Sequence, residues 1–433
     1  MRVLFTSMSA QSHIAPMLPL ARAVARVGHD VVFATGPDAV AQVQGAGLEA
    51  LPAGLSFIEV RRRYALASGS ELAGLSPQER LEHLLLHGLI GIAAPAMLDD
   101  LLPFARTWQP DLVIRNLGEP AAEVVATAAG VPHVIHGFSS PKSSYFATAH
   151  RAGLAELYEG CGIDPPSGDS RLATPYLDIW PEGLHPQAED WQYPNMWPLR
   201  PENAIPLTTP APRPAALDGL PYERTVYVTA GTTHNATPGL LETMLEGLRE
   251  ETVNVVVTIG PDGDLDRFGP QPEHVRIERY ISQNTLLPHC DVVVCSAGAG
   301  TVLGALAHAT PLVVAPVATD QYEMAAQVEQ AGAGRACSTQ PLLPAAVRES
   351  FQEVSCDPAY PATAARLREQ ILSMPTPAEL VRRLDELLAG DSHPAAPSTS
   401  RWLTPPARSR WLADRSPGRA VGWAAGAYAR KPG

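Results

Sequence analysis

The sequence predicts an α/β protein of two doubly wound, Rossmann-like domains that face each other across a cleft. A strand–helix–strand pattern occupies residues 3–34 and a similar alternation restarts at residue 225, with a proline-rich segment between the two halves. Parallel strands need a crossover connection, usually a helix, and this alternation supplies it. Ligands of such sheets bind at the carboxyl ends of the strands, so we expect the functional site there.

The first half, assigned to an N-terminal domain at residues 1–206, contains four short apolar runs typical of buried parallel strands. These predicted strands are residues 3–6, 31–34, 111–114 and 131–136. Apolar residues at helical spacing occupy residues 14–27, and residues 51–102 have a mostly helical pattern. From residue 165 to 221 the periodicity weakens, and we expect irregular structure there.

The second half begins after a predicted Pro-rich linker at residues 207–222. We assign residues 223–375 to a C-terminal domain and residues 376–390 to an amphipathic C-terminal helix. Its predicted strands are residues 225–229, 253–259, 275–278, 291–295 and 312–315. A helix is predicted at residues 238–248.

Composition limits the possible partners and compartment. The net charge of −13 argues against nucleic acid or an anionic membrane as the main partner. Five cysteines, without a Cys-x-x-Cys pair, fit a reducing cytoplasm better than a disulfide framework. No run approaches 18 apolar residues free of polar ones, so we expect no transmembrane segment.

The last residues, 391–433, differ from the rest of the chain. They hold seven Arg and Lys against two Asp, and Pro, Ser, Ala and Gly dominate. We expect a disordered basic tail. Three tryptophans, Trp402, Trp411 and Trp423, are unusual for such a segment and leave a docking role open.

The most informative motif is a glycine-rich turn at residues 296–301, Ser-Ala-Gly-Ala-Gly-Thr, which follows a buried strand. Backbone N–H groups and the helix dipole make such a turn a place to bind phosphate. Asp320 and Gln321 follow the next strand along the chain. Their side chains can hydrogen-bond sugar hydroxyls, and the two motifs together suggest a nucleotide-sugar site.

With these motifs, the sequence resembles family 1 glycosyltransferases of the GT-B fold, above all the actinomycete enzymes that act on polyketide, macrolide and enediyne natural products. The resemblance covers about residues 1–390. Its motifs, in order along the chain, are residues 1–6 with His13 to Pro16, residues 231–233, residues 280–283, the turn at 297–301 and the Asp320-Gln321 pair.

The resemblance implies an inverting hexosyltransferase of antibiotic biosynthesis. Such an enzyme moves a sugar, here a deoxysugar, from a nucleoside-diphosphate donor to a hydroxyl of a hydrophobic acceptor. It implies no cofactor and no metal ion. TDP is favoured as the donor nucleotide and UDP stays open.

The resemblance places the catalytic base at His13. We expect this residue at the start of a helix, where the dipole disfavours the imidazolium and keeps the ring neutral, as a general base requires. Relatives orient this base with an Asp or Glu, but the matching residue here is Asn116. Asn can fix the tautomer and cannot supply a negative charge. Glu119, three residues on, is the alternative partner.

The donor-binding residues are also implied by the resemblance. Tyr280 matches a residue that stacks on the base, Ile281 offers its backbone to the base edge, and Gln283 reaches the ribose. Ser296 stands where relatives carry a His that contacts the diphosphate, so we expect weaker diphosphate binding. The remaining implied residues are Thr232, Thr233, Gly298, Ala299, Gly300 and Thr301 at the diphosphate, and Asp320 and Gln321 at the sugar.

Two other functions compete with this one. A dinucleotide-dependent oxidoreductase would use the same glycine turn, but it needs an acidic residue at the end of the next strand, which here ends Val-Val-Ala-Pro. A non-catalytic relative that binds a ligand or assists another transferase is suggested by Asn116 and Ser296. The expected partners are a small-molecule acceptor and a nucleotide sugar, and a homodimer is compatible with the sequence.

Overall fold

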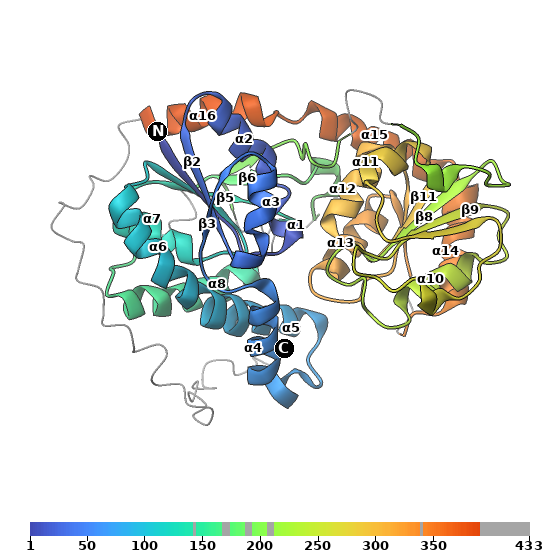
Figure 1. The fold of residues 1–433 in the computed structure, drawn as a ribbon, viewed down its shortest axis with the longest axis horizontal. Helices are drawn as coiled ribbons and strands as arrows, with labels where there is room; N and C mark the ends of the chain where they lie inside the picture. The colour runs from blue at the N-terminus through green and yellow to red at the C-terminus, as the bar shows by residue number, and fades with distance from the viewer. Residues whose placement is uncertain (142–143, 167–173, 187–192, 206–211, 338–340, 390–433) are drawn as a thin grey trace, which may run out of the picture.

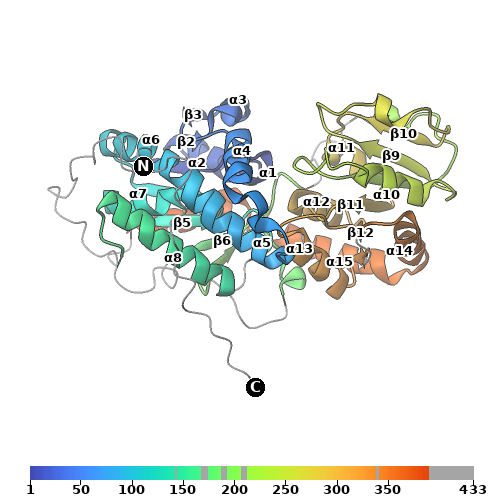
Figure 2. The same ribbon diagram turned by 90° about the horizontal axis from the view of Figure 1, so that it is seen from below.

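The computed structural model of the chain describes residues 1–141, 144–166, 174–186, 193–205, 212–337 and 341–389. These residues form two α/β domains side by side (Figure 1). Each domain is a parallel sheet with helices packed on its faces, and Figure 2 shows the same two bodies from below. The predicted fold class is confirmed.

The first sheet has seven parallel strands among the described residues, in the order β3-β2-β1-β4-β5-β6-β7. Its strands are β1 (Arg2–Thr6), β2 (Asp30–Thr35), β3 (Glu49–Pro52), β4 (Leu112–Asn116), β5 (His133–His136), β6 (Tyr176–Asp178) and β7 (Met196–Pro198). Strand β1 lies between β2 and β4, so its carboxyl end meets that of β4.

Most helices of the first domain precede residue 165. They are α1 (Gln11–Ile14), α2 (Leu18–Arg26), α3 (Val40–Gly45), α4 (Phe57–Ser68), α5 (Pro77–His83), the π-helix η3 (Leu84–Ala93), α6 (Ala94–Trp108), α7 (Ala121–Ala129) and α8 (Ser144–Cys161). Single 3₁₀ turns are η1 (Pro37–Ala39), η2 (Gly69–Leu72) and η4 (Glu182–Leu184).

The second sheet has six parallel strands among the described residues, in the order β10-β9-β8-β11-β12-β13. Its strands are β8 (Thr225–Thr229), β9 (Asn254–Thr258), β10 (Val275–Glu278), β11 (Val292–Cys295), β12 (Leu312–Val314) and β13 (Gly334–Ala336). Strand β11 lies between β8 and β12.

The helices of the second half are α10 (Leu240–Leu248), α11 (Gln283–Leu286), α12 (Ala299–Ala307), α13 (Gln321–Gln330), α14 (Pro344–Cys356), α15 (Ala359–Ser373) and α16 (Pro377–Ala389). The 3₁₀ turns are η5 (Ala215–Leu217), η6 (Asp266–Phe268) and η7 (Leu287–His289).

The last described helix, α16, returns to the first domain and packs against α2, as the upper edge of Figure 1 shows. Its buried residues Leu380, Val381 and Leu384 belong to an apolar cluster that also contains Leu20 and Val24 of α2. The same apolar cluster includes residues of α15 and of strands in the second sheet. Helices α15 and α16 therefore join the two domains by apolar packing, in addition to the covalent connection.

Polar contacts reinforce this junction. The Arg383 guanidinium lies 3.8 Å from the ring centroid of Trp197 at the edge of the first sheet. His29 Nε2 lies 3.3 Å from Asp385 Oδ1. The amide of Arg200 donates to the Pro375 carbonyl at 2.8 Å just before α16 begins. The C-terminal helix is therefore a structural part of the first domain.

One helical run is apolar for most of its length. Residues Gln78–Trp108, in α5, η3 and α6, are long and apolar enough to cross a membrane, judged by length and composition only. A single helix of this kind is weak evidence for a membrane span, because a core helix passes the same test. Several of its side chains, including Leu85, Ile90 and Met97, are buried in the core of the first domain.

The weakest sequence predictions concerned short strands. Strand β3 was not predicted, and β6 and β7 extend the sheet through the region expected to be irregular. The helix predicted at residues 14–27 is divided, because α1 ends at Ile14 and α2 begins at Leu18. Parts of the predicted linker and the whole predicted tail lie outside the described residues.

We predict that Leu384→Ala destabilises the protein by about 2–5 kcal/mol, because it leaves a cavity between α16 and α2. Leu384 is only 1% exposed. The exposed Glu386 on the same helix provides the control, since Glu386→Ala should change stability by less than about 0.5 kcal/mol. The midpoint of urea unfolding measures both. Equal midpoints for the two variants would show that α16 contributes little to the fold.

Candidate active site

His13 and Asn116 come together because their strands are neighbours. His13 lies in α1, shortly after β1, and Asn116 is the last residue of β4. The His13 Nδ1 atom lies 2.8 Å from Asn116 Oδ1. The same oxygen accepts the Gly118 amide at 2.9 Å, and Asn116 Nδ2 donates to the His13 carbonyl at 3.3 Å.

These bonds determine the tautomer of His13. A backbone N–H can only donate, so the amide atom facing Gly118 is the oxygen. An oxygen bound to Nδ1 requires that Nδ1 carry the proton. The other ring nitrogen, Nε2, is then the acceptor atom of a neutral imidazole, which is the form that a general base needs.

Two further residues fix the plane of the His13 ring. Phe138 stacks on it with ring centroids 3.7 Å apart and an interplanar angle of 27°. Gly118 approaches from another side, where a Cβ atom would lie 2.9 Å from His13 Cε1. Any side chain at position 118 would therefore displace the imidazole. The sequence shows no pattern that predicts either contact with the ring.

Glu119 has a different set of bonds. One carboxyl oxygen accepts the Ala121 amide at 2.9 Å and the other accepts the Ala122 amide at 3.3 Å. The carboxyl group thus satisfies the first turn of α7. Burial raises the pKa of Glu119, and the Thr6 hydroxyl and the Arg115 charge offset part of this rise. The geometry favours Asn116 over Glu119 as the residue that orients His13.

His13 does not lie at the start of a long helix, contrary to what the sequence predicted. Helix α1 has four residues, and His13 is the third of them, so it is not at the start of a long helix. A single turn has almost no macrodipole, and the ring lies near its C-terminal end. The hydrogen bond to Asn116 determines which ring nitrogen carries the proton when the imidazole is neutral.

The glycine turn of the second domain opens as predicted between β11 and α12. Ala297 has the left-handed φ of +61°, and Gly298 is the N-cap residue of α12. The amides of Thr301 and Val302 donate to the Gly298 carbonyl, each at 3.0 Å. A Cβ added at Gly298 or Gly300 would meet no atom within 4 Å. The space above the first turn is open to a ligand.

Ser296 and Gln321 point into the protein. The Ser296 hydroxyl donates to the Ala230 carbonyl at 3.2 Å and accepts from Gln321 Nε2 at 3.5 Å. Gln321 Oε1 accepts the amides of Val317 and Ala318 at 3.0 and 3.1 Å. Both side chains are buried and hold the loop before α13, which differs from the expected contacts of Ser296 with phosphate and of Gln321 with sugar.

Asp320 is better positioned than Gln321 for the predicted contact with sugar hydroxyls. It is the N-cap residue of α13, but its side chain makes no capping bond to that helix. It accepts the Thr319 hydroxyl at 3.1 Å. In the neighbouring loop after β8, Thr232 is exposed and Thr233 is half-buried. These three residues lie at the carboxyl edge of the second sheet.

The predicted base-binding residues divide into two kinds. The Tyr280 side chain is 65% exposed, which leaves its ring available for stacking. Ile281 packs against the core. Gln283 Nε2 donates to the Thr301 hydroxyl at 3.1 Å, so this side chain and Thr301 hold each other beside the start of α12.

Contacts between the domains bring both halves of the site together. Gln327 of α13 donates to the Ser140 hydroxyl at 2.6 Å, two residues beyond the Phe138 that stacks on His13. In the loop after β8, burial lowers the pKa of His234, Arg61 of α4 lowers it further, and Asp320 opposes them. Arg61 of the first domain therefore lies near the cleft edge of the second.

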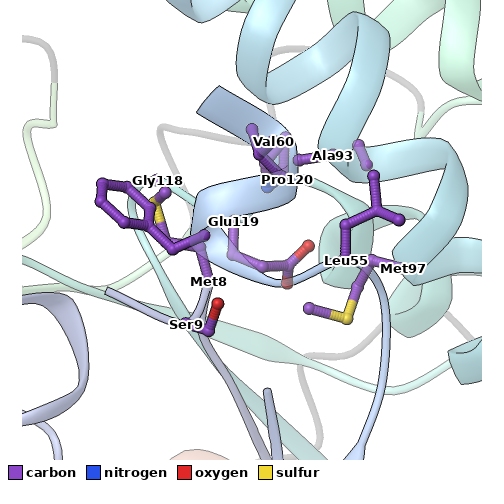
Figure 3. Close-up of a pocket in the computed structure, with 11 residues that line it drawn as sticks. Met8, Ser9, Leu55, Val60, Ala93, Met97, Gly118, Glu119 and Pro120 are labelled. Carbon is purple, nitrogen blue, oxygen red and sulfur yellow. The ribbon is translucent and has the colours of Figure 1, made fainter. Parts of the chain in front are cut away.

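A pocket adjoins the His13 site (Figure 3). Its lining comes from the loops after β1 and β4 and from α4, η3 and α6. It encloses about 350 Å³ of space between atoms, part of it open to solvent. The lining residues are Met8, Ser9, Leu55, Phe57, Val60, Ala93, Ala94, Met97, Gly118, Glu119 and Pro120.

Carboxylates at the spacing of a metal-binding Asp-x-Asp motif do occur, at Asp262, Asp264 and Asp266 in the loop after β9. Asp264 accepts the Asp266 amide at 3.0 Å. Among the described residues, no group of three or more His, Cys, Asp or Glu side chains is arranged to hold a metal ion. This loop thus carries no argument for a metal centre.

Comparison with known proteins shows which families and structures this chain resembles. Residues 22–165 match the domain family described as "Erythromycin biosynthesis protein CIII-like, N-terminal domain", and residues 242–387 match the corresponding C-terminal domain. The fold is also that of the glycosyltransferase VinC, whose structure contains dTDP. The TM-score is 0.70 at 24% identity, over 90% of this chain and 100% of VinC.

Two curated relatives extend the match to nearly the whole chain. The elloramycin glycosyltransferase ElmGT of Streptomyces olivaceus is 31% identical over 397 residues, which is 89% of this chain and 97% of that protein. The aclacinomycin-T 2-deoxy-L-fucose transferase of Streptomyces galilaeus is 27% identical over 453 residues, 90% of this chain and 96% of that protein.

The chain is therefore a GT-B glycosyltransferase that uses a nucleotide sugar. It belongs to the erythromycin biosynthesis protein CIII-like family of actinomycete natural-product glycosyltransferases. The oxidoreductase reading of the glycine turn is excluded by this membership.

We predict that Asn116→Ala lowers the turnover number for sugar transfer by tenfold or more, because Nδ1–H loses its acceptor and the ring loses its orientation. A general base contributes roughly 10²–10⁴-fold to turnover, and we expect a misoriented His13 ring to lose part of that contribution. Glu119→Gln should instead lower thermal stability, since an amide NH₂ would face one of the two α7 amides, at a cost of about 1–3 kcal/mol. A larger loss of turnover in Glu119→Gln would make Glu119 the partner of His13.

Proposed function

We propose that the protein is an inverting glycosyltransferase that moves a deoxysugar from a TDP-sugar to a hydroxyl of an apolar polyketide-type acceptor. The observation that carries this proposal is the hydrogen bond from His13 Nδ1 to Asn116 Oδ1 at 2.8 Å. It leaves Nε2 as a proton acceptor at the carboxyl edge of the first sheet, beside a mostly apolar pocket. The nucleotide site then occupies the facing edge of the second domain.

In the proposed reaction His13 acts as a general base. Nε2 takes the proton of the acceptor hydroxyl while its oxygen attacks the anomeric carbon from the face opposite the diphosphate. The bond from that carbon to the phosphate oxygen breaks, and the electron pair leaves with the nucleoside diphosphate. Attack and departure on opposite faces invert the anomeric configuration. One C–O bond forms and one breaks, with no oxidation.

The leaving diphosphate carries the developing negative charge. The open first turn of α12, with the amides of Ala299 and Gly300, is suited to stabilise it. Thr232 and Thr233 would contribute from the loop after β8. Asp320 would accept hydrogen bonds from sugar hydroxyls, and the exposed ring of Tyr280 would stack on the base.

The donor is proposed by analogy. The relative from Streptomyces galilaeus is named for transfer of 2-deoxy-L-fucose, and VinC, which shares this fold, holds dTDP. Both support a TDP-deoxysugar over a UDP-sugar here. The described cysteines, all five in the chain, are free thiols, which fits a cytoplasmic enzyme. We favour catalysis over an auxiliary role, because the His13–Asn116 pair is assembled.

We expect His13→Ala to lower the turnover number by roughly 10²–10⁴, the usual contribution of a general base, with little change in dTDP affinity. His29→Ala is the control. His29 lies just before β2, at the opposite end of the first sheet from the cleft, so its loss should leave turnover unchanged. Near-full activity of His13→Ala would mean that the acceptor ionises without help, and the proposed base would be abandoned.

The glycine turn makes a second prediction. Gly300→Asp places a carboxylate over the open first turn of α12, where it should weaken dTDP binding by more than tenfold through repulsion of the diphosphate. Ser296→Ala should change the affinity less than about threefold, because the Ser296 hydroxyl donates to Ala230. Calorimetric titration with dTDP compares them. A large loss in Ser296→Ala with a small one in Gly300→Asp would place the diphosphate elsewhere.

A further inference from the structure

A buried ion pair lies behind the end of β4 that carries Asn116. Arg115 precedes Asn116 in β4, and successive side chains of a strand point to opposite faces of the sheet. The Asn116 side chain contacts His13, whereas Arg115 Nη2 lies 2.7 Å from Oε2 of Glu123 in α7. The Arg115 and Glu123 side chains are only 1% and 8% exposed. The proposed reaction uses neither of them.

The surroundings keep this pair charged. Burial alone would raise the pKa of Glu123, but nearby positive charge, above all that of Arg115, brings it below its usual value. His133 of β5, whose Nε2 lies 3.8 Å from the Glu123 carboxylate, and His150 of α8 add smaller contributions. Arg115 is therefore the buried cation of this region and Glu123 is its anion.

The pair is not arranged for maximum stability. Arg115 Nε is buried and has no hydrogen-bond partner among the described residues. A guanidinium carries several N–H donors, and a buried charge whose donors are incompletely bonded costs free energy. Two apolar side chains of similar volume are often at least as stable as a buried ion pair. The arrangement favours a role in local geometry over a role in stability.

The guanidinium also holds the turn that follows β4. Arg115 Nη1 donates to the Asn116 carbonyl at 3.4 Å, a long bond that the positive charge strengthens. The same carbonyl accepts the Glu119 amide at 3.0 Å, which closes a tight turn over residues 116–119. Burial raises the pKa of Glu119, and the Arg115 charge is among the groups that offset this rise. Arg115 thus stabilises both ends of the turn.

This turn contacts the His13 ring in two ways. Gly118 lies inside it and approaches the ring so closely that a Cβ atom would be 2.9 Å from His13 Cε1. The Gly118 amide donates to Asn116 Oδ1, which is also the acceptor for His13 Nδ1. A shift of the turn would therefore move the surface that packs on the ring together with its hydrogen-bond acceptor.

We propose that Arg115 is a positioning residue for the transfer reaction. It holds the turn at residues 116–119, the turn orients His13, and Glu123 anchors the guanidinium to α7. Arg115 acts only through Asn116 and Gly118 and does not contact the substrates. The inference rests on the proposed function, because it takes His13 as the base.

The test replaces both members of the pair, since removal of Arg115 alone would leave the Glu123 carboxylate buried without its partner. The Arg115→Met/Glu123→Leu double variant removes both charges and keeps apolar side chains of similar size. Arg115→Lys is the second variant. It keeps a charge beside Glu123, but its single ammonium lacks the fork that also reaches the Asn116 carbonyl.

Tyr158→Phe is the matched control. The buried Tyr158 hydroxyl bonds to Thr127 Oγ1 at 2.9 Å and donates to the Glu123 carbonyl at 3.5 Å. Its loss alters a polar contact of α7 with α8 and leaves the guanidinium untouched. This variant should therefore behave as wild type in both measurements.

The first measurement is the tautomer of His13. NMR spectra of isotope-labelled histidine are recorded about two pH units above the usual histidine pKa, and the His13 signals are assigned by comparison with His13→Ala. Wild type should show the Nδ1–H tautomer. The double variant and Arg115→Lys should show the Nε2–H tautomer beside it. Thermal unfolding of the same samples establishes that each variant is folded.

The second measurement is the turnover number. We expect a loss of roughly ten- to a hundredfold in both variants, the effect of displacing a reacting group by about 1 Å, with unchanged dTDP affinity. A wild-type His13 tautomer in either folded variant, or an altered one in Tyr158→Phe, would overturn the proposal. An altered tautomer with wild-type turnover would confirm that Arg115 holds the turn and would count against His13 as the base, so the two inferences fail separately.

Discussion

The oxygen of the Asn116 side chain is the constraint on which the first half of the site depends. It receives two hydrogen bonds at once, from the His13 ring and from the Gly118 amide. These two bonds join the loops that follow neighbouring strands and leave the imidazole one tautomer. Because the amide is neutral, it orients the His13 ring, the proposed base, without stabilising an imidazolium by charge.

The sequence predicted the long-range architecture well because buried parallel strands are continuous apolar runs with helices between them. Strands β6 and β7 were missed because each has three residues and is defined by its neighbours, with no period of its own. The division of the first helix was missed for a related reason. The apolar spacing continues from Ile14 through Leu18, and only the structure shows that the backbone leaves the helix between them.

At the site, motif positions could be predicted and side-chain directions could not. Gln321 follows a strand as expected, but its amide turns back to bind the loop at Val317 and Ala318. Ser296 similarly bonds to Ala230 on the adjacent strand's loop. The direction of Ser296 depends on packing against a loop 66 residues away in the sequence. The direction of Gln321 depends on the geometry of its own loop. Neither leaves a pattern in the local sequence. The contacts of Phe138 and Gly118 with the His13 ring likewise depend on packing and leave no pattern in the local sequence.

Helix α13 connects the two halves of the site along its length. Asp320 stands at its start, on the proposed sugar side, and Gln327 further on bonds to Ser140 of the first domain. Ser140 follows closely after Phe138, which stacks on His13. The placement of the His13 ring is therefore sensitive to how the second domain sits against the first.

The return of α16 to α2 has a consequence for biosynthesis. During translation helix α2 leaves the ribosome roughly 350 residues before α16, the helix that covers it. At about 5–20 residues per second this interval is on the order of 20–70 s. Throughout it, the apolar face around Leu20 and Val24 lacks the side chains of Leu380 and Leu384 that bury it in the finished protein. The nascent chain therefore exposes an apolar surface that α16 later covers. Early termination of synthesis leaves a product prone to capture by chaperones.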